Sequence, residues 1–123
     1  MKFRPYVAID IETTGIPTAD YIPQILELSV VFDDLGEKLR EPMTLHLQIS
    51  HDELSWQNED VKKLNLELSE RTQKEGVDMD TARDFLFDFL EKAKELNGGF
   101  DLTVSAKNVN TFLVPTLKGN GMA

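Results

Sequence analysis

The stretch Tyr6-Val7-Ala8-Ile9-Asp10-Ile11-Glu12-Thr13-Thr14-Gly15 decides the fold of this chain. Its alternating side chains are typical of a β-strand that runs into a loop ending at glycine. Because successive side chains of a strand point to opposite faces, we expect Asp10 and Glu12 on one face, with Cα atoms roughly 6.5–7 Å apart. Carboxylates at this spacing can share two divalent ions about 3.5–4 Å apart, which would remove the cost of two acids on an apolar strand. The stretch therefore predicts a metal site; the alternative is a solvated acidic face of an edge strand.

The composition narrows the class of protein. A chain of 123 residues, 41% of them hydrophobic, is expected to form one globular domain. The sequence contains no cysteine, so it can form neither a disulfide framework nor a thiolate metal site. No apolar run approaches the ~18 residues of a membrane span, and the N-terminus lacks the apolar core of a signal peptide. We therefore expect a cytoplasmic protein with no membrane partner.

The charge of the chain restricts how it can bind nucleic acid. The formal net charge is −9, with 13 basic residues against 22 acidic residues. Proteins that coat nucleic acid broadly need clustered Lys and Arg, and this balance argues against such a surface. An enzyme that grips a few nucleotides through bound metal remains compatible with it.

Two further strands are expected in the first half of the chain. The run from Ile22 to Phe32 is rich in Ile, Leu and Val, and the residues from Thr44 to Ile49 alternate between apolar and polar. The turn signal Asp33-Asp34-Leu35-Gly36 leaves a short connection between them, which indicates an antiparallel hairpin. From His51 to Gly76 we expect one or two short helices or irregular turns.

The clearest helix signal runs from about Thr81 to Leu96. Asp80 is its expected N-cap, with Asp78 just upstream, and Asn97-Gly98-Gly99 is a strong stop signal. One face of this helix carries apolar residues at helical spacing: Ala82, Phe85, Leu86, Phe89, Leu90 and Ala93.

A fourth strand is expected at 101–106, and a further helix at 111–117. Pro115 would then lie in the first turn of that helix, where its missing N–H is tolerated. The residues at 118–121 are expected to end the chain loosely. This order of elements predicts an α/β or α+β fold.

The string V-A-I-D-I-E-T-T-G resembles the first motif of the DnaQ-like (DEDD) 3′→5′ exonucleases, the group that holds polymerase proofreading domains and oligoribonucleases. The resemblance implies an α/β fold with an RNase H-like mixed sheet and flanking helices. It also implies metal-dependent removal of nucleotides from the 3′ end of single-stranded DNA or RNA. Asp10 and Glu12 would then be catalytic ligands of two Mg²⁺ or Mn²⁺ ions, hard cations suited to oxygen ligands.

The same resemblance assigns substrate-binding residues. Thr13, Thr14 and Gly15 match the segment that holds the 3′-terminal nucleotide in that family, and Ile16 matches a position where an apolar residue wedges against a base. The alternative for these four residues is an ordinary turn, in which Gly15 supplies a backbone angle or a close approach that a Cβ would prevent.

Four other side chains have weaker claims to function. Glu27 could support the metal ligands, but a solvated strand face is the preferred interpretation. Trp56 could stack on a base, but a core contact of a surface helix is preferred. His46 and His51 are possible general bases, although neither has the place in the chain that the family gives its base.

The second motif of the family is only partly matched. The text Ser105-Ala-Lys-Asn-Val-Asn-Thr-Phe-Leu-Val-Pro-Thr-Leu117 resembles a pattern of Asn, a short spacer, Phe and a third acidic ligand. Asn108 and Phe112 match, so Asn108 is a further substrate-binding candidate. The position of the acid, however, holds Leu113, which cannot bind a metal.

The third motif, a His or Tyr followed by an Asp, is absent from the sequence. We therefore expect either a truncated or mutated piece of an exonuclease domain, lacking its C-terminal part, or a degenerate relative. Hydrolysis should be far slower than in an intact relative. The rival functions are a non-catalytic relative that binds nucleic acid or a protein partner, and a plain scaffold. The sequence leaves the oligomeric state open, a homodimer included.

Overall fold

A computed structural model describes residues 5–35, 38–39, 41–99 and 101–122 of the chain. Over these residues the fold is α/β, with a mixed sheet of four strands and three α-helices. The strands are β1 (Tyr6–Thr13), β2 (Ile25–Asp33), β3 (Met43–Gln48) and β4 (Thr103–Ser105). The helices are α1 (Glu59–Glu75), α2 (Met79–Leu96) and α3 (Val114–Gly119), and a π-helical turn, η1 (Val109–Leu113), leads directly into α3.

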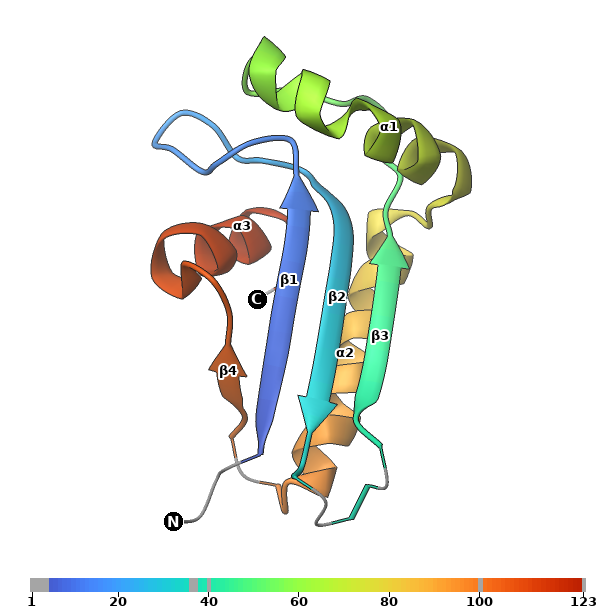
Figure 1. Ribbon diagram of the computed structural model, residues 1–123, viewed down its shortest axis with the longest axis vertical. Helices are drawn as coiled ribbons and strands as arrows, with labels where there is room; N and C mark the ends of the chain where they lie inside the picture. Colours follow the sequence, from blue (N-terminus) through green and yellow to red (C-terminus); the bar gives the residue numbers. More distant parts are fainter. Residues whose placement is uncertain (1–4, 36–37, 40, 100, 123) are drawn as a thin grey trace.

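The strands lie in the order β3-β2-β1-β4. β2 is antiparallel to both β1 and β3, which confirms the expected hairpin, whereas β4 runs parallel to β1. α2 runs along the back of the sheet, and α1 crosses the C-terminal ends of β1 and β3 (Figure 1). β2 begins at Ile25, three residues later than expected, because the ring of Pro23 removes a backbone donor that a strand interior needs.

The core lies between the sheet and α2. The apolar residues of β1 face it, with Val7 fully buried and Ile9 and Ile11 nearly so. From α2 the buried residues are Ala82, Leu86, Phe89 and Ala93. The predicted face of this helix is therefore confirmed except at its edge, because the Phe85 side chain is 50% exposed.

The start of α2 differs from the expectation by two residues. The helix begins at Met79, and Asp78 rather than Asp80 is the N-cap. The Asp78 carboxylate accepts a hydrogen bond of 2.7 Å from the Thr81 backbone N–H. Asp80 instead lies in the first turn and forms an ion pair with Arg83.

The segments before and after α2 also differ from the expectation. α1 is a single helix of 17 residues, longer than the one or two short helices or irregular turns expected, and Asn58 caps its first turn by accepting from the Val61 N–H. β4 spans only three residues. The end of the described chain is not loose, because Leu117 and Met122 pack into the core.

Candidate functional site

Asp10 and Glu12 lie on the face of β1 that the core does not cover. Both are exposed, while Ile9, Ile11 and Thr13 between and beside them are buried. The two carboxylates therefore share one face of the strand, as the alternation predicts. Across the sheet, Asp10 is paired with Ser29 and Glu12 with Glu27.

A cleft of about 330 Å³ lies over this part of β1. Its walls come from β1, from the loop after it, and from the segment that follows β4. The residues that line it are Ile9, Asp10, Ile11, Glu12, Ile16, Lys107, Asn108, Phe112 and Leu113. The structure thus brings Asp10, Glu12, Ile16 and Asn108 together, although Asn108 lies far from the others in sequence.

The parallel pairing of β4 with β1 explains this meeting. The last register pair is Ala8 with Ser105, so the chain leaves β4 beside the part of β1 that leads into Asp10 and Glu12. The chain then turns sharply at Asn108, whose backbone is left-handed with φ of 52°. Such a conformation is more accessible to Asn than to most other residues. The turn directs the chain into η1, and π-helical turns occur frequently at functional sites.

Glu12 is crowded by negative charge. Although the Glu12 side chain is largely exposed, partial loss of solvent around its carboxyl raises the pKa, and the charges of Asp10 and Glu27 raise it further. Within the described part of the chain, neither Asp10 nor Glu12 forms an ion pair. A divalent cation bound by the two carboxylates would supply the missing positive charge.

The donor set fits one hard cation better than two. Carboxylate oxygens are suitable ligands for Mg²⁺ or Mn²⁺, and Asp10 and Glu12 supply them from one strand face. Among the residues described, however, no group of three or more His, Cys, Asp or Glu side chains is arranged to hold a metal. Leu113, which follows Phe112 in the wall of the cleft, is 2% exposed and packs into the core.

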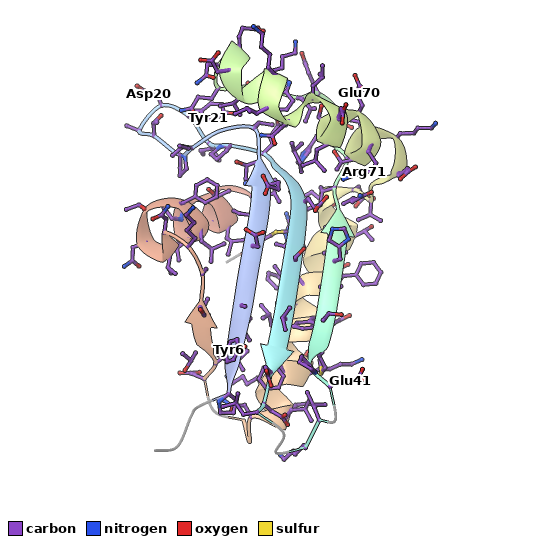
Figure 2. The ribbon with its side chains drawn as sticks, viewed as in Figure 1. Tyr6, Asp20, Tyr21, Glu41, Glu70 and Arg71 are labelled. Carbon is purple, nitrogen blue, oxygen red and sulfur yellow. The ribbon has the colours of Figure 1, made fainter. Side chains whose placement is uncertain are left out.

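Thr13 and Thr14 direct their side chains inward. The Thr13 hydroxyl donates to the Gly15 carbonyl oxygen. The Thr14 hydroxyl accepts from the Gln24 N–H at 2.9 Å and lies 2.6 Å from the Tyr21 hydroxyl. Figure 2 shows Tyr21 in the loop beyond the end of β1. These hydroxyls hold the loop that follows β1, and neither residue lines the cleft of about 330 Å³.

Gly15 is required by a close approach rather than by an unusual backbone angle. A Cβ at this position would lie 2.5 Å from Cβ of Gln57 and 2.8 Å from the Tyr21 ring. Gln57 also accepts from the Ile16 N–H through its side-chain oxygen, at 2.9 Å. This contact fixes the backbone of Ile16, whose side chain is 59% exposed at the cleft.

Glu27 lies next to Glu12 but is already engaged. Its carboxylate oxygens lie 3.1 Å from His46 Nε2 and 3.5 Å from Arg71 Nη2. Figure 2 shows Arg71 on α1, near the end of β3. Glu27 is therefore partly buried in an ion-paired cluster on the open face, and not simply solvated as we expected.

The other two candidates take structural positions. The ring of His51 forms a hydrogen bond of 2.7 Å with the Ile25 carbonyl oxygen. Trp56 is partly buried in the irregular segment before α1, not in a helix as expected. Neither residue lines the cleft.

The sequence interpretation overlooked one residue of the cleft, Lys107. Its role depends on the parallel pairing of β4 with β1, which no local pattern reveals. A smaller hollow of about 200 Å³ adjoins the cleft and shares four residues with it: Ile11, Glu12, Ile16 and Phe112. Its other wall is α1, where the Leu64 side chain is 83% exposed.

No protein-family model matches this chain, and no curated protein matches it either. No helix among the described residues has the length and apolar character needed to span a membrane.

Proposed function

We propose that the cleft is the active site of a metal-dependent 3′→5′ exonuclease of the DnaQ-like type, acting on ends of single-stranded DNA or RNA. One observation carries the proposal: both motifs that resemble that family, one on β1 and one after β4, line the same cleft. The strand order β3-β2-β1-β4, with β2 antiparallel to the other three strands, is compatible with an RNase H-like fold and supports the proposal.

Each wall of the cleft has a role in this reaction. Asp10 and Glu12 would hold Mg²⁺ or Mn²⁺, which when bound supplies a Lewis acid for the phosphodiester and lowers the pKa of bound water. The exposed Ile16 and the Phe112 ring offer apolar surfaces for the terminal base. The Asn108 side chain, which caps no helix, can donate or accept hydrogen bonds with the nucleotide. Hydrolysis would break the P–O3′ bond and release a nucleoside 5′-monophosphate.

The buried Leu113 favours a second candidate, binding of a nucleic-acid end with little hydrolysis. Where the family has its third acid, this chain has a leucine that packs into the core. Loss of one strong electrostatic contribution typically lowers kcat by about 10²–10³-fold. We therefore infer that the 123-residue chain binds the 3′ end of a nucleic-acid strand but hydrolyses it slowly.

The test is release of mononucleotides from 3′-labelled single-stranded DNA and RNA in the presence of Mn²⁺, with affinity for the uncut strands measured in parallel. We expect binding that requires Asp10, and cleavage at least about 10²-fold slower than that of an intact proofreading exonuclease. The control is Asp80→Ala, which removes an exposed acid elsewhere. Binding and cleavage that are the same in wild type and Asp10→Ala would refute the proposal. Brisk cleavage by the wild-type chain would refute only the role given to Leu113.

A further inference from the structure

Lys107 is the cation of the cleft. It is exposed in the turn two residues after β4 ends, and it lines the same cleft as Asp10 and Glu12. Within the described part of the chain it forms no ion pair within 4.0 Å, not even with the two carboxylates beside it. Its charge is therefore available to a ligand.

The two walls of the cleft have opposite charge. Asp10 and Glu12 lie on β1, and Lys107 lies on the segment after β4, with the apolar Phe112 close by. A ligand that suits this arrangement carries a phosphate, which can contact a cation held by the carboxylates and an ammonium group at the same time. Lysine binds phosphate as a point charge with three N–H donors. In a chain of net charge −9, a basic group placed here adds local attraction for an anionic ligand.

We propose that Lys107 binds a phosphate of the substrate strand in the cleft, and so makes the site selective for nucleotides over nucleosides. This inference rests on the proposed function. It predicts that the released nucleoside 5′-monophosphate keeps affinity for the cleft through the same contact. Lys107 would then contribute to binding of strand and product without being a ligand of the metal.

The test compares Lys107→Gln with wild type in Mn²⁺, using adenosine and its 5′-monophosphate in ribose and deoxyribose forms. A charge-assisted hydrogen bond to phosphate predicts that the variant binds the monophosphates about tenfold more weakly. It should bind the nucleosides and Mn²⁺ as wild type does. Lys107→Arg, which keeps the positive charge, should bind the monophosphates with an affinity close to that of wild type. Lys92→Gln, an equal change of charge on the remote helix α2, should change nothing.

A second measurement follows the affinity for a single-stranded oligonucleotide with an uncleavable 3′-terminal linkage as the salt concentration rises. The logarithm of the association constant falls linearly with the logarithm of the salt concentration. Loss of one phosphate contact in Lys107→Gln should make this slope less steep by about 0.7. If wild type and Lys107→Gln bind monophosphates equally and show the same slope, the role of Lys107 is refuted while the proposed function stands. Loss of Mn²⁺ binding in Lys107→Gln would also refute it, since Lys107 would then act through the carboxylates. If Asp10→Ala binds Mn²⁺, the monophosphates and the oligonucleotide as wild type does, both proposals are refuted.

Discussion

Glu12 holds its negative charge at a cost to the fold. Burial and the neighbouring charges of Asp10 and Glu27 raise the pKa of the Glu12 carboxyl above its usual range. A carboxyl with a raised pKa in the folded state destabilises the fold once it is ionised. Stability should therefore fall as pH rises from the usual Glu range through the raised pKa of the folded state. A divalent cation bound beside Glu12 would offset this cost.

We predict that Glu12→Gln raises Tm at neutral pH in metal-free buffer. The gain should shrink as the pH is lowered, and vanish where the carboxyl of wild type is protonated in both the folded and the unfolded state. Thermal melts across this range, with Glu70→Gln as an equal change of charge on α1, test the prediction. A gain that is the same at every pH would show that the charge of Glu12 is not its cause.

Leu113 combines two environments, since it lines the cleft and packs into the core. We predict that Leu113→Asp lowers Tm in metal-free buffer, because a charge placed at a buried site without a partner is costly. Mn²⁺ should restore part of that loss, because a cation that binds only the folded state stabilises it. In the control Leu113→Asn, the new side chain is similar in size to Asp but neutral, so Mn²⁺ should raise Tm by less. Equal recovery in the two variants would contradict a role for position 113 beside the metal.

The α2 helix shows what periodicity can and cannot reveal. The spacing of its apolar residues correctly predicts a buried face, but it does not show how far burial extends around the helix. Both Phe85 and Phe89 lie beside residues of the edge strand β3, but Phe89 is 8% exposed and Phe85 is 50% exposed. Which of these two rings is covered depends on tertiary packing. The sequence pattern alone therefore could not distinguish the buried Phe89 from the half-exposed Phe85.

Phe89→Ala should therefore cost about 3–5 kcal/mol in the free energy of unfolding, as deletion of a buried aromatic ring usually does. Phe85→Ala removes the same atoms from a half-exposed site and should cost much less. Denaturant unfolding of both variants measures the difference. Equal losses would mean that the packing of α2 has been misassigned.

The start of α2 provides a pH-dependent test. Hydrogen bonds from Thr81, the backbone one largest, lower the pKa of the Asp78 carboxyl below its usual range. A lowered carboxyl pKa contributes stability above the usual Asp range, and this contribution is lost as pH falls through the lowered value. Asp78→Ala should therefore destabilise the protein more than Asp80→Ala at neutral pH, and the gap should close in acid. A larger effect of Asp80→Ala would assign the N-cap to that residue instead.

Local signals explain which elements the sequence could predict. β1 was predictable because its alternation is complete within one stretch, and the hairpin of β2 and β3 because their connection is short. The length of α1 was not predictable, because its apolar residues are sparse and its capping residue, Asn58, precedes them without a clear pattern. Pro23 shortens β2 at a point where the apolar run continues on both sides.

Long-range pairing decides the composition of the cleft. Asp10 and Glu12 could be identified from one strand, and Asn108 only by resemblance to a family motif. Lys107 could not be identified, because its place in the cleft beside Asp10 depends on the parallel pairing of β4 with β1. Nor could the sequence show that Thr13 and Thr14 use their hydroxyls within the loop. The cleft is thus a property of the assembled sheet, with one wall from each end of the chain.

The central claim is that Asp10 and Glu12 hold a divalent cation in this cleft. Isothermal titration of wild type with Mn²⁺ tests it, beside Asp10→Ala and a control, Asp80→Ala, in which an exposed acid of α2 is removed. We expect weak binding with about one ion per chain, because two carboxylates supply only part of a coordination sphere. We also expect it to weaken as pH falls, since a raised pKa leaves Glu12 protonated more readily. Binding heat that disappears in Asp10→Ala and persists in Asp80→Ala is the predicted result, and equal heat from all three proteins would contradict the claim.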